Sequence, residues 1–182
     1  MNSRRALTGA VATLGMACAA LATSGTTADA AKPTKERISE EYSFLAEDYC
    51  GLEDQVEIEG TFESVLQIHN RRGVDYYLEH QVIRETHTLG DVSVTRVSKP
   101  MFKDLKIVDQ GDTVLITVLG TGPESTYGPD GKAISRNPGQ FRFRITVDEE
   151  TGEEIEGSFT VLKESTGRTD DFCADVLPVL QG

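Results

Sequence analysis

The sequence contains no tryptophan, and aromatic residues make up only 7% of its 182 residues. Proteins that bind sugars or nucleobases usually present aromatic rings for stacking, so this composition disfavours both functions. Basic residues are also few: 18 Lys and Arg stand against 30 Asp and Glu, which gives a formal net charge of -12. A field of this sign repels phosphate backbones and anionic lipid head groups, so we expect no nucleic-acid partner and no membrane-surface role.

Long apolar runs are missing after residue 30, so we expect no membrane insertion by a later segment. The one apolar stretch, residues 6–22, follows Arg4-Arg5 and precedes the small-x-small motif Ala28-Asp29-Ala30. This order is typical of a secretory signal peptide. We predict cleavage after Ala30, with Ala31 as the near alternative, and a secreted, extracellular protein. The paired arginines leave the twin-arginine route open beside the general secretory route.

Cysteine is scarce, with 3 residues in the chain. Cys18 would leave with the signal peptide, so Cys50 and Cys173 remain. In an oxidising compartment such a pair predicts one disulfide bond. The rival interpretation, a reactive thiol, has no support because no histidine or basic cluster flanks either cysteine.

The hydrophobic pattern predicts three segments. Residues 1–30 form the signal peptide, and residues 31–47 form a flexible N-terminal leader with room for a short helical turn near Ile38 to Leu45. Residues 48–182 form a single domain with about eight strands, because apolar residues there alternate with period two. We expect an all-β antiparallel meander closed into a calycin- or allene-oxide-cyclase-like barrel, with a β-sandwich as the alternative.

Two hairpins can be registered from the sequence. A three-residue loop, Arg71-Arg72-Gly73, would place Ile68 opposite Tyr76 and every apolar pair on one face. A two-residue turn, Gln110-Gly111, would place Ile107 opposite Val114. The segment from Thr113 to Leu119 is apolar on both faces, which predicts a central strand.

The predicted register places Ser64, His80 and Arg84 on the inward face, where they could line a cavity for a polar or anionic ligand. Two other interpretations stay open: the strand leaves the core near His80, or a bulge reverses the alternation there. His69 and His87 are expected on the outward, solvated face. We expect no metal site, because no second inward histidine accompanies His80.

Catalytic and cofactor motifs are missing. The sequence has no Gly-x-Ser-x-Gly, no His-Glu-x-x-His and no phosphate loop, so we predict no catalytic residues and no cofactor. The acidic residues are dense only around 149–154, which we interpret as a solvated turn rather than a calcium loop.

Several stretches carry a resemblance to a family: the signal peptide, Tyr49-Cys50-Gly51, the hairpin at 109–112, Asn137-Pro138-Gly139-Gln140-Phe141, and residues 165–173. With them the chain resembles the small secreted proteins of actinobacteria that are mostly described as hypothetical. The resemblance implies a secreted β fold with one disulfide and brings no established activity.

The leading hypothesis is a non-enzymatic extracellular binding or envelope-associated protein, a monomer whose partner is a small ligand or an extracellular protein. The second hypothesis is a barrel-type cyclase- or isomerase-like enzyme that uses His80 as acid or base. The third is an interaction module that acts through its surface.

Overall fold

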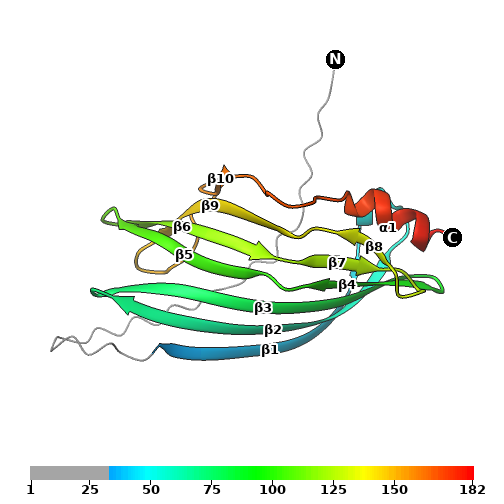
Figure 1. The fold of residues 1–182 in the computed structure, drawn as a ribbon, viewed down its shortest axis with the longest axis horizontal. Helices are drawn as coiled ribbons and strands as arrows, with labels where there is room; N and C mark the ends of the chain where they lie inside the picture. The colour runs from blue at the N-terminus through cyan, green and yellow to red at the C-terminus, as the bar shows by residue number, and fades with distance from the viewer. Residues whose placement is uncertain (1–32) are drawn as a thin grey trace, which may run out of the picture.

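The computed structural model describes residues 33–182, so the predicted signal peptide lies outside the described residues. The described chain folds into one mostly antiparallel 10-stranded sheet with a short 3-10 segment and a short α-helix (Figure 1). The elements are β1 (Thr34–Ala46), η1 (Tyr49–Gly51), β2 (Val56–Arg71), β3 (Val74–Leu89), β4 (Val92–Ser98), β5 (Met101–Asp109), β6 (Thr113–Gly122), β7 (Glu124–Tyr127), β8 (Ala133–Arg136), β9 (Gly139–Asp148), β10 (Thr160–Lys163) and α1 (Phe172–Leu180).

A line of prolines interrupts the meander across neighbouring strands. β4 continues into β5 past Pro100, β6 leads into β7 past Pro123, and β8 leads into β9 past Pro138. The breaks lie next to one another: the N–H of Lys99 donates to the Pro123 carbonyl at 3.0 Å. Proline has no N–H to give to a sheet, so each long strand is broken there. We call this line of breaks the crease.

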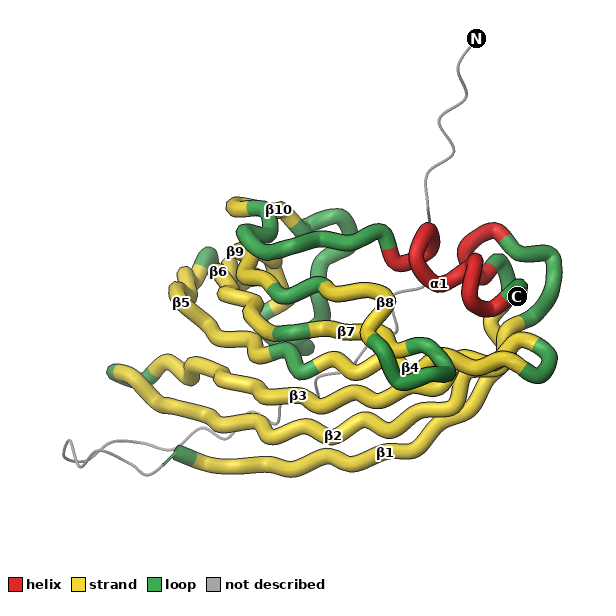
Figure 2. The backbone as a smooth tube through the Cα atoms, turned by 45° about the vertical axis from the view of Figure 1, so that its right-hand side comes forward, coloured by secondary structure: helices red, strands yellow, loops and turns green. Residues whose placement is uncertain are grey.

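β3 connects the parts on the two sides of the crease. One of its edges pairs with β2 along its whole length, while the other edge pairs with β4 over Ile83–Leu89 and with β5 over Leu78–His80. Figure 2 shows β4, β7 and β8 close to α1, and β5, β6, β9 and β10 farther from it. We call the first group the covered end of the sheet and the second group the open end.

The sheet does not close into the expected barrel, and it does not form the alternative two-sheet sandwich, because all strands belong to one sheet. Closure would require β1 to pair with β10. β1 has 13 residues whereas β10 has 4, and the pairing of β10 with β9 shifts between Val161 and Lys163. Both strands therefore end the sheet as edges. The predicted central strand is confirmed, since β6 pairs with β5 and with β9.

The core lies at the covered end, between the sheet and α1. We call the face of the sheet that packs against η1 and α1 the inner face, and the opposite one the outer face. The buried cluster draws on η1, β2, β4 and α1, and consists of Tyr49, Val56, Ile58, Val94, Val176 and Leu180. Alternation along the paired strands then assigns the other strand residues to one face or the other.

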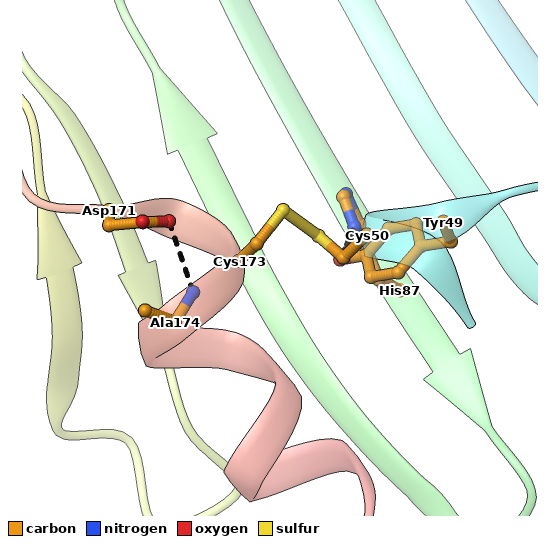
Figure 3. Close-up of a disulfide and its surroundings, with 6 residues drawn as sticks. All are labelled: Tyr49, Cys50, His87, Asp171, Cys173 and Ala174. Carbon is orange, nitrogen blue, oxygen red and sulfur yellow. Dashed lines mark hydrogen bonds between the residues drawn. A yellow bond between two sulfur atoms is a disulfide. The ribbon is translucent and has the colours of Figure 1, made fainter. Parts of the chain in front are cut away.

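The predicted disulfide is confirmed: Cys50 and Cys173 are bonded, with Cα atoms 5.5 Å apart (Figure 3). It joins η1 to α1. The helix begins where the Asp171 side chain accepts a hydrogen bond from the Ala174 N–H at 3.1 Å, a regular N-cap. This helix is not predicted by the sequence analysis, because its pattern covers only 9 residues.

The expectation of a flexible leader with a helical turn is wrong for the residues of β1. Thr34–Ala46 pairs with β2 in an unbroken antiparallel register, from Thr34 opposite Ile68 to Ala46 opposite Val56. The pattern is weak because β1 is an edge strand with most side chains exposed on both faces. Its apolar residues Ile38, Tyr42 and Leu45 also fit a helical spacing.

The predicted register of the first hairpin is wrong by one residue. Arg71 pairs with Val74 across a two-residue turn, and Arg72 and Gly73 both have positive φ, 56° and 87°. This is the geometry of a type I′ turn, whose twist matches that of the strands. Ile68 therefore lies opposite Tyr77.

In the second hairpin the chain turns through four residues rather than the predicted two. Asp109 pairs with Val114, and the N–H of Gln110 donates to the Thr113 carbonyl. Ile107 consequently lies opposite Ile116. A shift of two residues leaves each side chain on its predicted face, so this error changes no assignment to a face.

Candidate functional site

The predicted cluster of Ser64, His80 and Arg84 is not assembled. Ser64 is buried on the inner face and lies opposite Gln81, whereas His80 pairs with Val65 on the outer face. Arg84 is on the outer face as well, and both it and His80 are exposed. The cause is the one-residue shift of the first hairpin, which moves every side chain of β3 to the other face.

The same shift brings a polar network to the inner face of the covered end. His87, expected in solvent, is buried and contacts the Tyr49 hydroxyl through Nδ1 at 2.7 Å. Its Nε2 lies 3.4 Å from Glu85. Arg96 lies opposite Glu85 on β4 and donates to it at 2.8 Å, and its other terminal nitrogen donates to Glu124.

Tyr42 enters this network from β1 by crossing β2. Its hydroxyl donates to Glu85 at 2.8 Å, although a whole strand separates the two residues. The crossing requires glycine at position 60: a Cβ there would lie 2.5 Å from the Tyr42 ring. The space that the missing side chain of Gly60 leaves is therefore filled by Tyr42.

Glu85 and Arg96 of this network are charged at neutral pH. Burial alone would raise the pKa of Glu85, but hydrogen bonds from His87, Tyr42 and Arg96 outweigh burial and lower this pKa to about 2. Burial raises the pKa of the hydroxyls of Tyr42 and Tyr49 above their usual range, so both stay protonated. Burial would lower the pKa of Arg96, but hydrogen bonds to Glu124 and Glu85 raise it.

Glu85, His87 and Tyr49 bond to protein groups and are shielded from solvent, so they hold β1, β3 and η1 in place. Arg96 and Glu124 differ, because their side chains remain 31% and 22% exposed. They are the part of the network that a solute can reach.

A pocket of about 290 Å³ lies beside this accessible pair, at the crease. Glu124, Ser98 and Phe141 form part of its wall, and the segment containing Ser165 and Thr169 forms another part. That segment is held against the sheet, because the N–H of Thr166 donates to the Gln140 carbonyl at 3.2 Å. The pocket wall therefore includes one carboxylate, Glu124, and one aromatic ring, Phe141.

An aromatic row continues from the pocket across the open end, on the inner face. It consists of Phe102 on β5, Phe141 and Phe143 on β9, and Phe159 before β10. Phe143 lies at the centre and contacts each of the other three rings, with centroids between 5.1 and 6.5 Å apart. Phe141 covers Gly120 on the next strand, where a Cβ would lie 2.6 Å from the ring. The end of the row is open to solvent, since Phe159 is 51% exposed.

Asp104 is a separate buried acid at the open end. It lies on β5 where the ladder to β3 ends, and its carboxylate accepts a hydrogen bond from the Tyr77 N–H at 2.8 Å. Burial raises its pKa to about 6, and this hydrogen bond only partly opposes the rise.

Among residues 33–182, no three His, Cys, Asp or Glu side chains are grouped in a way that could hold a metal ion. Within the same residues, no helix has the length and apolar character needed to cross a membrane.

The sequence analysis missed most of this site, although part of its signal was visible. Ile83, Glu85 and His87 are spaced two residues apart, so they share one face of β3. The correct hairpin register would have placed that face inward. Nothing in the sequence indicated that Arg96 and Glu124 would meet, because they come from β4 and β7. The chain matches no protein-family model, no curated protein and no solved structure.

Proposed function

We propose that this chain is an exported, non-enzymatic binding protein whose ligand lies on the inner face, from the crease pocket along the aromatic row. The export signal supports the location, and the disulfide is consistent with an oxidising compartment. The observation that carries the proposal is the combination of charge and apolar surface on that face.

The cations of the sheet gather on its outer face, which leaves the inner face acidic. Among the strand residues that the structure describes, Arg96 is the only Lys or Arg on the inner face. The outer face carries Lys35, Arg37, Arg71, Arg84, Lys103, Lys106, Arg136, Arg142, Arg144 and Lys163. The inner face carries the carboxylates Glu36, Glu40, Asp75, Glu79, Glu85, Asp104, Asp109 and Glu124, whereas on the outer face carboxylates such as Glu41, Glu57, Glu59 and Glu63 stand among the cations.

This division selects one class of ligand. Arg96 bonds to both Glu85 and Glu124, so these three groups together leave one net negative charge beside the pocket. A negative charge attracts a cation, and the faces of phenylalanine rings attract cations too. The row of rings offers apolar contact next to that charge. The preferred ligand is therefore an amphiphile with a positive group that binds near Glu124 and an apolar part that lies along Phe141 and Phe143.

An enzymatic role finds less support in this arrangement. His80, the acid or base of the enzyme hypothesis, is exposed on the outer face, away from the pocket. The buried groups Glu85 and His87 are occupied by protein partners. A polar or anionic ligand, as expected from the sequence, would meet an acidic surface.

The test compares decyltrimethylammonium with decyl sulfate below their micelle concentrations, by isothermal titration calorimetry. We expect the cation to bind and the anion to bind at least about tenfold more weakly, a difference of about 1.4 kcal/mol. Glu124→Gln and Phe159→Ser should each weaken binding of the cation.

Matched controls are Glu63→Gln and Leu45→Ser, which change exposed residues of the outer face. They should leave the affinity unchanged. Equal affinity for both amphiphiles, or equal losses in the controls, would contradict the proposal.

A further inference from the structure

β1 is a long edge strand that is protected against pairing by charged side chains, without the other usual devices. It has 13 residues, more than most strands, and it pairs with β2 on one edge while no described element pairs with its other edge. Within Thr34–Ala46 there is no proline and no bulge. Proteins usually blunt such an edge with these devices, because its free N–H and C=O groups are a template for another strand.

On the opposite side of the sheet, the edge strands are short or covered. There the edge strand β10 has only 4 residues. The edge at β8 is covered, because the Arg136 N–H donates to the Asp170 side chain at 2.9 Å and α1 packs nearby. The exposure of β1 is therefore not a general property of this fold.

The charges on β1 are complementary to a second copy of themselves. On the outer face the strand reads Lys35, Arg37, Ser39, Glu41, Ser43, so positive charge precedes Ser39 and negative charge follows it. An antiparallel copy centred on Ser39 places each Arg37 directly opposite the other copy's Glu41. Opposite charges in facing positions stabilise a pair of strands.

Neighbouring symmetric registers are less favourable. Centred on Arg37 or on Glu40, the two copies would place like charges directly opposite each other. Centred on Ile38, they would place Glu36 opposite Glu40. Moving the centre by one residue shifts the pairing by two residues, so each of these registers keeps the faces of the two copies aligned.

We propose that two copies of this chain associate through β1, antiparallel about Ser39, so that one sheet continues across both copies. The interface is isologous, as two-fold symmetry requires. It departs from the monomer expected from the sequence, and it is independent of the ligand proposed for the inner face.

Charge reversal tests the interface without disturbing the fold. Arg37 and Glu41 face neutral residues of β2, Val65 and Thr61, so no intrachain ion pair is lost. In sedimentation velocity over a concentration series, the protein should form a dimer. R37E and E41R should each weaken the dimer by at least about tenfold in dissociation constant, and the double variant R37E/E41R should restore it. The control R144E changes the charge equally, on the outer face of β9.

The register between the two copies of β1 can be tested separately, by thiol crosslinking. Ser39→Cys should give a covalent dimer with a short thiol crosslinker, because the two copies of residue 39 face each other, whereas Ser43→Cys should not. A monomer at all concentrations, a dimer that R37E leaves intact, or a double variant as weak as the single ones would each overturn the proposal.

Discussion

The two ends of the sheet share the same long strands β2 and β3 but differ in what lies on their inner face. At the covered end, η1 and α1 pack on the sheet, and the least exposed side chains of the described chain are there: Val56, Val94, Thr126, Ser135 and Val176. At the open end, apolar side chains such as Phe159 and Val161 remain about half exposed.

The difference shows that the strands alone do not create a core in this protein. The pattern of alternation is as regular in β9 as in β4, yet only β4 is buried by a second layer. We infer that the covered end carries most of the stability, and that the open end is left free for binding. The following variants test this division.

The largest effect is expected from the disulfide. Its cysteines are 123 residues apart, so the chain-entropy model assigns it about 5 kcal/mol as an upper estimate. The double variant Cys50→Ser/Cys173→Ser should lower the melting temperature strongly, as measured by circular dichroism. Reductant should destabilise the native protein and have no effect on the variant. A variant as stable as the native protein would show that the disulfide does not stabilise the covered end.

Glu85→Gln should cost about 3 kcal/mol at pH 7, because it leaves the partly buried Arg96 with one carboxylate fewer. The folded-state pKa of Glu85, about 2, lies below its ordinary value of 4.5. Its contribution is therefore present above pH 4.5 and is lost as the pH falls towards 2. Urea unfolding across this range should show the loss in the native protein and not in the variant. Glu63→Gln is the exposed control, and equal curves for both variants would contradict the prediction.

Matched valine truncations compare the two ends directly. Val94 is 1% exposed at the covered end, whereas Val161 is 50% exposed at the open end. Val94→Ala should cost about 2 kcal/mol in unfolding free energy, and Val161→Ala less than about 0.5 kcal/mol. Similar losses would show that the open end is as tightly packed as the covered end.

Asp104→Asn should have a smaller effect than Val94→Ala, and of opposite sign. The folded-state pKa of Asp104, about 6, lies above its ordinary value of 3.8. The native protein should therefore lose stability as the pH rises from about 4 to 6, and the variant should not. At pH 7 the variant should be more stable by about 1 kcal/mol, less than the shift alone implies because the charged form accepts the Tyr77 N–H. A less stable variant would show that this bond outweighs the burial.

The sequence predicted the antiparallel meander, the central strand and the disulfide, because period-two patterns, turn residues and cysteine number are local signals. It failed at Arg72, since arginine is an unusual residue for the first position of a type I′ turn. Because of the register error at this residue, the sequence analysis placed His80 and Arg84 on the inner face, where the structure has Glu85 and His87. The strand count was low because β1 is exposed and because the prolines divide the long strands.

The site could be predicted only in part, for a related reason. Its ion pair joins Arg96 on β4 to Glu124 on β7, and its pocket is completed by the segment that contains Ser165 and Thr169. Such contacts are set by the arrangement of the whole sheet and leave no mark in any single segment. Tyr42 illustrates the point, since its partner lies 43 residues away and is reached over Gly60.

The bond between Cys50 and Cys173 also has a topological consequence. It closes residues 50–173 into a covalent ring that contains β2 to β10, and β1 is the one strand of the described chain that lies outside it. The ring limits the conformational entropy that every other strand gains when it detaches from the sheet. β1 is outside the ring, so it gains the most and should detach most easily. Its backbone amides should be the first in the sheet to exchange with deuterium, and pairing with another copy should slow that exchange.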